Sequence, residues 1–410
     1  MRILVSAYAC EPRRGSEPGV GWNWARELAR HHEVWVLTRS NNREPIEREL
    51  ADHSSDHPPM KFLYVDLPGW ASRLKRGQRW VHPYYYAWQF AARRVARRAH
   101  AETPFDVVHH VTFASAFTPA LVRLPGVPFI WGPVGGGVRV PWRLVPAGGT
   151  AAITYETLRA GRRLVGRYLD PLVRLTWRGA DLILVQNQET LAWLPPRYRA
   201  RARVQTNCGV DDHEIGSVQR PARRDDGFVA VAAGRLMHLK GFSLALRAVS
   251  ETGDHRVRLV VAGEGPQRRH LEALAADLGL DGRVVFRGAL SRPDLLDLFA
   301  RSDVLLFPSL HDEAGFVVVE AMSQGSIPIV LDVGGPASLV ESSAYVVPAR
   351  GCSREDVVAN LASALRSASA EDLEAKRAVM IEHARSLAWS TKTAALEPVV
   401  ASPARLTHQR

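Results

Sequence analysis

Short apolar runs alternate with amphipathic segments along most of the 410-residue chain. Apolar runs of this length, bounded by turn residues, are typical of strands buried on both faces, and the intervening spacing is typical of helices. The alternation occurs twice, which predicts two parallel sheets with crossover helices, an α/β arrangement. The expected strands lie at 2–8, 32–38, 61–67, 105–111, 127–132 and 180–186, and then at 228–234, 257–263, 283–288, 302–309 and 326–332.

The apolar pattern lapses over 204–227, where Pro, Gly, Asp and Arg crowd together. Such a stretch is typical of a link between domains. We place the boundary near residue 212, which gives a first domain over 1–211 and a second over 212–386. Helices are expected at 15–31, 242–251, 267–279 and 292–301, and the tail after Pro403 is expected to fray.

Composition supports a globular protein, with 46% hydrophobic and 23% charged residues. One core stops growing near ~250 to 300 residues, so this length indicates two domains. No apolar run approaches the ~18 residues of a membrane span, and the start MRILVSAYACEP lacks the features of a signal peptide, so we expect a cytoplasmic protein. Three scattered cysteines fit no disulfide framework or zinc cluster and are expected to be small buried side chains: Cys10, Cys208 and Cys352.

The net charge of +11 is unevenly distributed. Residues 1–210 hold 30 basic and 16 acidic side chains, a charge of +14, and the remainder holds 23 basic and 26 acidic, a charge of −3. A basic first half attracts nucleic acid, an anionic membrane surface or an anionic small molecule, since all respond to the same field. A solvated surface without a partner explains it equally well.

Two loops at expected strand ends are candidates for anion binding. Gly15, Gly19 and Gly21 lie between the first strand and the first helix, where backbone amides could receive an anion, although the spacing does not match the dinucleotide fingerprint G-x-G-x-x-G. A plain strand-to-helix turn is the alternative. In the second half, Gly234 and Arg235 follow a strand, and Lys240 comes five residues later before a helix.

Two cations at one strand end could stabilise the charge that develops on a departing diphosphate. A solvated pair in a loop is the alternative for Arg235 and Lys240. A third element, SLHDEAGFVVVEAMSQGSIPIV, has Asp312 and Glu320 bracketing seven residues. Carboxylates there could accept hydrogen bonds from sugar hydroxyls, while helix-start amides face phosphate. The alternative is a capped helix followed by a strand.

These motifs together resemble the donor domain of GT-B glycosyltransferases, in particular retaining family 4, the glycosyl transferases group 1. GRLMHLKG, VVAGEGP, VVFRGAL and the segment from Asp312 to Glu320 occur in that family's order and spacing. The resemblance implies two doubly wound Rossmann-like domains facing across a cleft. It also implies that a final segment, 387–410, crosses back onto the first domain.

By this resemblance the second half binds the donor. Arg235 and Lys240 would bind the diphosphate, and Asp312 would hold the donor sugar. Asp312 stands where the family usually has glutamate, and Glu313 beside it could substitute. The remaining implied donor contacts are the amides of Gly315, Phe316 and Val317, the ribose ligand Glu320, the turn at Gly263 and Glu264, and the strand end at Arg287 and Gly288, with Gly234 at the start of the loop.

The first half resembles the acceptor domain less closely. In the family a histidine after the fourth strand lies near the reacting sugar, but the usual pattern spaces two histidines by one residue, whereas His109 and His110 are adjacent. Neighbours on a strand face opposite ways, and we favour His110. A buried structural histidine is the alternative for both. Gly135, Gly136 and Gly137 could let backbone approach a ligand or form a flexible loop. Cys208 replaces the family's usual asparagine.

Aromatic and basic residues interleave over 70–100. This segment could rest on a membrane surface or hold an anionic acceptor, or it could be an ordinary amphipathic helix with its aromatic face in the core. Peripheral contact with the inner membrane face through the basic first domain is therefore one expectation.

The expected function is transfer of a hexosyl group, with retention, from a nucleoside diphosphate sugar (a UDP-sugar first, a GDP-sugar second) to a hydroxyl of a glycan, a lipid-linked sugar or a small secondary metabolite. The donor is a co-substrate; no cofactor and no metal are expected, because the sequence offers no D-x-D or ordered acidic cluster. Alternatives are a sugar-nucleotide epimerase or a phosphorylase on the same fold. A basic nucleic-acid binding protein is a further alternative, although no recognition-helix, zinc-finger or RNP signature is present, and we expect no nucleic-acid partner.

Overall fold

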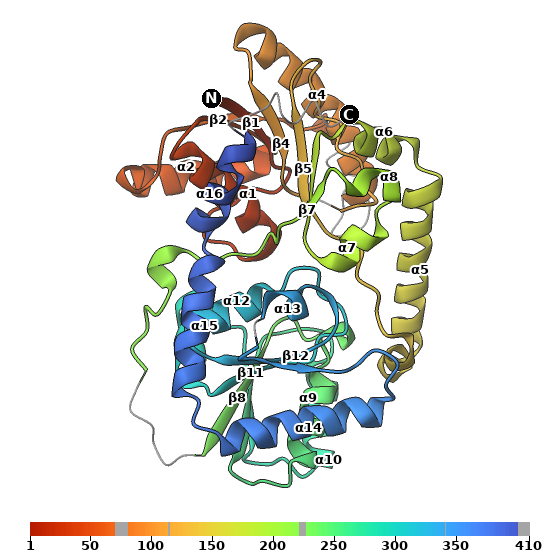
Figure 1. The fold of residues 1–410 in the computed structure, drawn as a ribbon, viewed down its shortest axis with the longest axis vertical. Coiled ribbons are helices and arrows are strands. Elements are labelled where there is room, and N and C mark those ends of the chain that lie inside the picture. Colours follow the sequence, from red (N-terminus) through yellow and green to blue (C-terminus); the bar gives the residue numbers. More distant parts are fainter. Residues whose placement is uncertain (70–80, 114, 221–226, 341, 401–410) are drawn as a thin grey trace. The chain divides into compact units, whose positions relative to one another are not determined.

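A computed structural model describes residues 1–69, 81–113, 115–220, 227–340 and 342–400. The chain divides into two compact units, and Figure 1 follows it through them by colour. The first unit comprises Met1–Gly137, Ala160–Asn207 and the chain from Trp389 onward, and the second comprises Val138–Arg159 and Cys208–Ala388. Each unit has its own parallel sheet and its own hydrophobic core.

The first unit contains a seven-stranded sheet in the order β3-β2-β1-β4-β5-β6-β7. All pairings are parallel. The chain proceeds outward from β1 to β3 and then returns to β4 beside β1, so the winding reverses between β1 and β4. The strands are β1 (Arg2–Ser6), β2 (Glu33–Thr38), β3 (Met60–Tyr64), β4 (Val107–His110), β5 (Phe129–Val134), β6 (Leu182–Val185) and β7 (Ala202–Val204).

Helices cover this sheet with apolar faces. In α4, the buried residues Tyr85, Trp88, Ala92 and Ala96 recur every three or four positions, the spacing of one helix face. Of the segment 70–100, residues 70–80 lie outside the described residues. The rest lies in α4 and packs its aromatic face into the core, as expected of an ordinary amphipathic helix. The helices are α1 (Ser16–Ala29), α2 (Arg43–Asp52), α4 (Val81–Glu102), α6 (Pro171–Gly179), α7 (Gln188–Trp193), α8 (Pro196–Arg199) and α16 (Trp389–Val400).

The second unit repeats the doubly wound arrangement with six parallel strands in the order β10-β9-β8-β11-β12-β13. The winding reverses between β8 and β11. The strands are β8 (Phe228–Ala233), β9 (Val257–Ala262), β10 (Val284–Gly288), β11 (Val304–Phe307), β12 (Ile327–Leu331) and β13 (Tyr345–Val347). The helices are α9 (Phe242–Glu251), α10 (Arg268–Asp277), α11 (Arg292–Arg301), α12 (Phe316–Ser323), α13 (Gly334–Leu339), α14 (Arg354–Ala370) and α15 (Glu374–Ser386).

The unit boundaries differ from the sequence-based domains by a few residues at 208–211 and 387–388, and by a whole segment at 138–159. Val138, Val140, Leu144 and Val145 are buried in the core of the second unit, whereas the sequence boundaries assign them to the first domain. Helix α5 (Gly149–Tyr168) follows this segment and continues from the second unit into the first. Apolar burial, rather than position along the chain, decides which unit contains 138–159.

The end of the described chain returns to the first unit. Trp389 at the start of α16 is 2% exposed, and its ring lies 6.4 Å from that of Trp24 on α1 in an edge-to-face arrangement. The helix before it, α15, contacts α12 in the second unit. The expected crossing segment 387–410 is described as far as residue 400, and the expected frayed tail lies outside the described residues.

Candidate functional site

The carboxyl ends of β8 and β11 form the point where the winding of the second sheet reverses. Loops that leave such neighbouring strands in opposite directions leave a crevice between them, and ligands of open α/β sheets bind there. The loop after β8 carries Gly234, Arg235 and Lys240, and the loop after β11 carries Asp312. Topology therefore brings two of the sequence motifs to one edge.

Close backbone contact holds these two loops together. The Leu310 amide donates to the Leu239 carbonyl at 2.8 Å. Gly241 has a left-handed φ of 69°, and a Cβ there would lie 1.9 Å from the Pro308 carbonyl oxygen. Only glycine satisfies both the conformation and the space. Lys240 is thereby fixed one residue before the contact.

Lys240 and Asp312 form an ion pair with Nζ 2.5 Å from Oδ2, and their side chains are 26% and 17% exposed. The other carboxylate oxygen accepts from the amides of Ala314 at 3.1 Å and Gly315 at 3.0 Å. Asp312 thus links the ammonium to the turn that opens α12. The expected meeting of Lys240 with this helix start is present, but Asp312 is occupied by protein partners.

Helix α12 begins directly after this turn. Gly315 has a φ of 89°, and a Cβ there would lie 2.9 Å from Leu339 Cδ1. The first-turn amides of Phe316 and Val317 have no carbonyl four residues back within the helix, and both residues are only partly buried. They remain suited to an anion, because the helix dipole adds positive potential at this end.

The ends of β8, β9 and β10 form the rest of this edge. The Gly234 amide donates to Ala262 at 2.9 Å, and the Gly263 amide donates to Gly288 at 2.7 Å. A Cβ on Gly263 would lie 1.9 Å from the Gly234 carbonyl oxygen. Gly263 is therefore required by close approach of one protein loop to another, whereas Gly234 has open space beside it and a φ of 141°.

Some charged side chains on this edge form ion pairs with the protein and others do not. Glu264 pairs with Arg268 at 3.0 Å, and its Oε1 lies 3.0 Å from where a Cβ on Gly288 would stand. Arg235 and Arg287 are exposed, and their guanidinium groups make no ion pair with any residue that the structure describes. Arg235 follows β8 at the winding reversal, whereas Arg287 lies on the outer strand β10.

Glu320 is buried on α12 and faces a cation that sequence reasoning missed. Arg292 Nη1 lies 2.5 Å from Glu320, and the same guanidinium binds Glu214 through two hydrogen bonds of 2.5 and 2.6 Å. Burial raises the pKa of Glu320 even though Arg292 opposes the shift. Burial also lowers the pKa of Arg292, but Glu214 and Glu320 outweigh it and raise that pKa overall. No local sequence signal links 214, 292 and 320.

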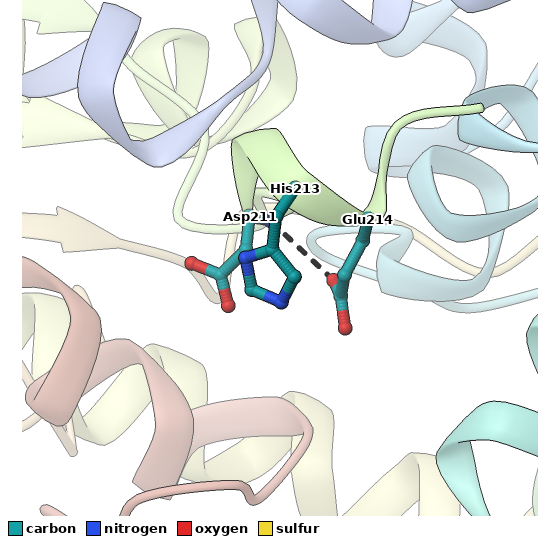
Figure 2. Close-up of side chains that lie close together, drawn as sticks. All are labelled: Asp211, His213 and Glu214. Atoms are coloured by element: carbon teal, nitrogen blue, oxygen red, sulfur yellow. Dashed lines mark hydrogen bonds between the residues drawn. The ribbon is translucent and has the colours of Figure 1, made fainter. Parts of the chain in front are cut away.

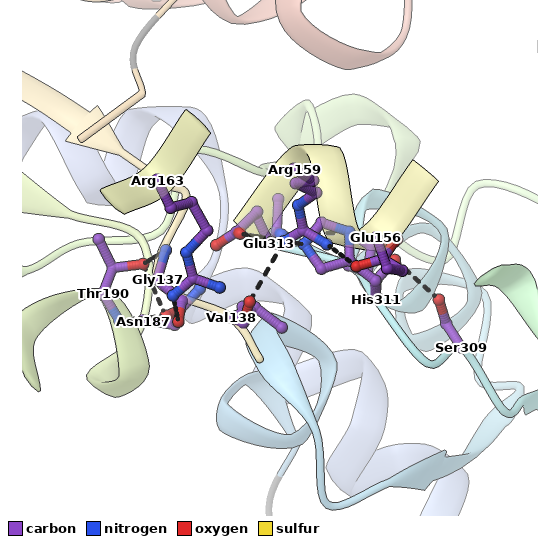
Figure 3. Close-up of polar contacts among 12 residues, drawn as sticks. Gly137, Val138, Glu156, Arg159, Arg163, Asn187, Thr190, Ser309, His311 and Glu313 are labelled. Carbon is purple, nitrogen blue, oxygen red and sulfur yellow. Dashed lines mark hydrogen bonds and ion pairs between the residues drawn. The ribbon is translucent and has the colours of Figure 1, made fainter. Parts of the chain in front are cut away.

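A second missed cluster surrounds Arg159 on α5, within the second unit. Figure 3 shows Arg159 beside Glu156, His311 and Glu313. Its guanidinium pairs with Glu156 at 3.1 Å and Glu313 at 3.8 Å and donates to the Val138 carbonyl at 3.2 Å. Glu313, the expected substitute for Asp312, is thus already paired, and His311 lies 3.2 Å from it.

Three residues of the second unit could hold a metal ion. Asp211, His213 and Glu214 extend from one short helical turn (Figure 2), and their ligand atoms lie within 4.8 Å of one another. Sequence analysis did not single out this grouping. Glu214 is, however, bound by Arg292 and takes part in a capping box with Asp211. Those contacts give the group a structural explanation.

The glycine-rich turn of the first unit is built for close packing. A Cβ on Gly19 would lie 1.9 Å from the Arg14 carbonyl oxygen, and one on Gly21 would lie 2.1 Å from that of Ala9. Both glycines let α1 pass against the loop that precedes it. Gly15 is exposed at the N-cap of α1, with nothing within 4 Å of an added Cβ. Of the three, Gly15 is the one with open space beside it.

His109 and His110 are both buried on β4 and face opposite ways. His109 Nε2 lies 2.8 Å from the Gly132 carbonyl oxygen. His110 contacts Tyr85 through Nε2 and Ser6 through Nδ1, both at 3.0 Å. Burial lowers the pKa of His109 to about 4 and that of His110 to about 3, so both rings are neutral near pH 7. Protein groups engage both ring nitrogens of His110, the candidate that we favoured from sequence.

The run Gly135–Gly137 is packed rather than open. The Ala116 amide donates to the Gly135 carbonyl at 2.7 Å. A Cβ on Gly136 would lie 2.7 Å from the ring of Phe117, and one on Gly137 would lie 2.2 Å from the Thr190 backbone. The glycines allow close approach, as one interpretation held, but the approaching groups belong to the protein.

Two doubly wound units of this kind, with converging loops at the winding reversal of the second sheet, define the GT-B class of fold. The family model described as glycosyl transferases group 1 matches residues 217–387, and that described as glycosyl transferase 4-like domain matches residues 15–208. The chain belongs to the GT-B glycosyltransferase family.

Three similar proteins illustrate the range of relatives. The 2-deoxystreptamine glucosyltransferase of Streptomyces kanamyceticus is 40% identical over 114 residues, 27% of this chain and 30% of that protein. The D-inositol 3-phosphate glycosyltransferase of Mycobacterium marinum is 33% identical over 233 residues, 53% of this chain and 49% of the relative. Anabaena Alr3699/HepE, solved in complex with UDP, is 17% identical with a TM-score of 0.61, over 98% of this chain and 99% of that one. At that identity the likeness is one of fold.

Within the described ranges, no helix combines the length and the apolar character needed to cross a bilayer.

Proposed function

We propose that the chain is a retaining, metal-independent glycosyltransferase that moves a hexosyl group from a nucleoside diphosphate sugar to an acceptor hydroxyl. One observation carries the proposal: Lys240, Asp312 and the start of α12 converge at the winding reversal of the second sheet. UDP-sugars are the first candidates and GDP-sugars the second. The UDP and UDP-glucose complexes of the Anabaena protein support that order.

The diphosphate is the part of the donor that this edge suits best. As the bond between the sugar and the diphosphate breaks, negative charge grows on the leaving phosphate, and groups fixed nearby stabilise that charge without reorganising. Lys240 supplies an ammonium, and Phe316 and Val317 supply amides at a helix start. Arg235, exposed at the end of β8, supplies a second cation. The diphosphate would compete with Asp312 for Lys240.

No protein nucleophile is needed for transfer with retention. The bond from the anomeric carbon to the diphosphate oxygen breaks, and a bond to the acceptor oxygen forms on the same face. The acceptor's proton passes to the leaving diphosphate. Asp312 would hold a sugar hydroxyl and Glu320 a ribose hydroxyl, in competition with the protein partners that both carboxylates already have. His109 and His110 would shape the first unit rather than exchange protons, because their pKa values are low and their nitrogens are engaged.

The acceptor class stays open among a glycan, a lipid-linked sugar and a small metabolite. We place the reaction in the cytosol, which the three unbridged cysteines support, two of them buried. We also expect no metal in the reaction. We explain the grouping of Asp211, His213 and Glu214 by the capping box between Asp211 and Glu214 and by the ion pair of Glu214 with Arg292. Removal of divalent ions should therefore leave turnover unchanged.

Thermal denaturation with nucleoside diphosphates and their sugars tests donor binding. A ligand at 100 times its dissociation constant should stabilise the chain by about 2.7 kcal/mol. Release of free diphosphate that depends on an added acceptor would separate transfer from epimerisation, and the anomeric configuration of the product, read by NMR, would test retention. Specific nucleic-acid binding without any stabilisation by sugar nucleotides would overturn the proposal.

A further inference from the structure

A pocket of about 290 Å³ lies in the first unit between α4, the segment 120–125 and α6. Residues 120–125 lead into β5, and Leu175 and Thr176 on α6 lead toward β6. Both segments therefore approach the amino ends of their strands, whereas binding sites of open α/β sheets form at the carboxyl ends. The pocket therefore lies away from the carboxyl ends of these strands.

Arginines without anionic partners gather at this pocket. Arg93 and Arg123 line it, and Arg97 is close enough to Arg93 to repel its charge. Burial, reinforced by Arg97 and Arg123, lowers the pKa of Arg93. In the described part of the chain, none of these three guanidinium groups makes an ion pair. Arg93 Nε is buried and makes no hydrogen bond, and a buried charged donor in this state is costly.

The position of Arg123 depends on the absence of a side chain at residue 179. Gly179, at the end of α6, lies under Arg123. A Cβ added to Gly179 would stand 2.2 Å from Nη1 and 2.6 Å from Cζ of Arg123. The guanidinium therefore lies against the helix end, in space that a side chain at residue 179 would occupy.

The walls and rim of the pocket are apolar. Leu121, Leu124 and Pro125 line it beside the arginines. Leu175 lines it as well and is 43% exposed, and Phe90, one turn before Arg93 on α4, is 54% exposed. A ligand with one compact anionic group and an apolar or glycerol-like substituent fits this combination, because guanidinium forks match phosphate oxygens while the rim contacts carbon.

We propose that this pocket binds the phosphate group of an organic phosphate through Arg93 and Arg123, with Arg97 adding to the field and Leu175 contacting the substituent. The phosphate belongs to an anionic lipid headgroup or to a soluble phosphate ester. Either ligand would supply the buried Arg93 Nε with the acceptor that the protein does not provide. A lipid source would anchor the first unit at an anionic surface.

The test compares two pairs of charge-removing substitutions in the full-length chain. Arg93→Gln with Arg123→Gln changes the pocket, and Arg94→Gln with Arg98→Gln removes the same charge from exposed positions of the same helix. Inorganic phosphate binding is measured by calorimetry. We expect the pocket pair to weaken binding by about tenfold or more, the equivalent of about 1.4 kcal/mol, and the control pair to weaken it by less than about threefold. Equal losses in both pairs, unchanged binding in the pocket pair, or no phosphate binding by the wild type would overturn the proposal.

A third variant keeps every charge. Gly179→Ala should displace Arg123 and weaken phosphate binding, while stabilisation by a nucleoside diphosphate, which reports an intact second unit, stays at the wild-type level. Phosphate binding at wild-type strength in a folded Gly179→Ala protein would contradict the assigned role of Arg123.

Vesicles identify the source of the phosphate. Co-sedimentation with phosphatidylcholine vesicles that contain phosphatidylglycerol, lost in the pocket pair and kept in the control pair, would assign the pocket to a lipid headgroup. Loss of inorganic phosphate binding with unchanged vesicle binding would assign it to a soluble ester. In either case the proposed glycosyl transfer is tested independently, since its residues lie in the second unit.

Discussion

Replacing Lys240 with methionine removes the ammonium and nearly preserves the length of the side chain. Nζ lies 2.5 Å from Asp312 Oδ2 with both side chains largely shielded. At an effective dielectric constant of about 20, unit charges this close attract by roughly 6 to 7 kcal/mol before other terms. Desolvation, side-chain ordering and partial exposure reduce the net contribution of the pair to about 1 kcal/mol. Asp312 also keeps its two amide partners, so the expected loss of folding stability is small.

The expected effect on the reaction is larger. If Lys240 stabilises charge that grows on the diphosphate, its removal should lower kcat by about 100- to 1000-fold, or about 3 to 4 kcal/mol of barrier, by analogy with the loss of an oxyanion-hole donor. Binding of the intact donor should weaken less than kcat falls, since the charge is greatest in the transition state.

Lys376→Met is the matched control. Lys376 also forms a 2.5 Å ion pair, with Glu371, and is 29% exposed. Both variants should unfold at similar urea concentrations, but only Lys240→Met should lose turnover, measured as release of nucleoside diphosphate. A wild-type rate for Lys240→Met, or equal rate losses in the two variants, would refute the assignment of Lys240 to the diphosphate.

Three further outcomes are expected. Gly241→Ala should lower the free energy of unfolding by about 1 to 3 kcal/mol more than Gly253→Ala, because both glycines have a φ near 70° but only the first would clash; equal losses in urea titrations would argue against the clash. Because the pKa values of His109 and His110 are low in the folded chain, the unfolded chain binds more protons between about pH 6.5 and 4. The free energy of unfolding should therefore decrease as the pH is lowered through this range, by about 1.4 kcal/mol per pH unit for each histidine. His110→Gln should flatten that slope, and an unchanged slope would assign the acid sensitivity elsewhere. Turnover should survive EDTA, and loss that Mg²⁺ or Mn²⁺ restores would overturn metal independence.

Most of the fold follows from local apolar pattern. Every strand predicted from the sequence is present, and the helices expected at 242–251 and 292–301 have those bounds in the structure. The strands that prediction missed, β7 and β13, have three residues each. Such short edge strands are defined by pairing with a neighbour and carry too few residues for a periodic signal.

The segment 138–159 shows a different limit. Its apolar residues predict burial, but only the completed core of the second unit determines where Val138 and Val145 pack. Position along the chain assigned them to the first domain. The choice between two cores is a property of tertiary packing, which local pattern does not contain.

Some contacts of the candidate site could also be predicted from the sequence, and others could not. Lys240 and Asp312 could be brought together from sequence, since both follow strands whose carboxyl ends must share an edge. The contacts of Arg292 with Glu214 and of Arg159 with Glu313 could not, because each pair is far apart in sequence and no short motif contains both of its members. The same reason explains why Tyr85 and Ser6, the partners of His110, were not foreseen.

A crystal structure of the chain with a bound nucleoside diphosphate tests the central claim most directly. Our account predicts that the terminal phosphate lies within hydrogen-bonding distance of Lys240 Nζ and the amides of Phe316 and Val317, with Arg235 turned toward it and the contact between Lys240 and Asp312 loosened. A diphosphate bound away from this edge, with that ion pair unchanged at 2.5 Å, would contradict it.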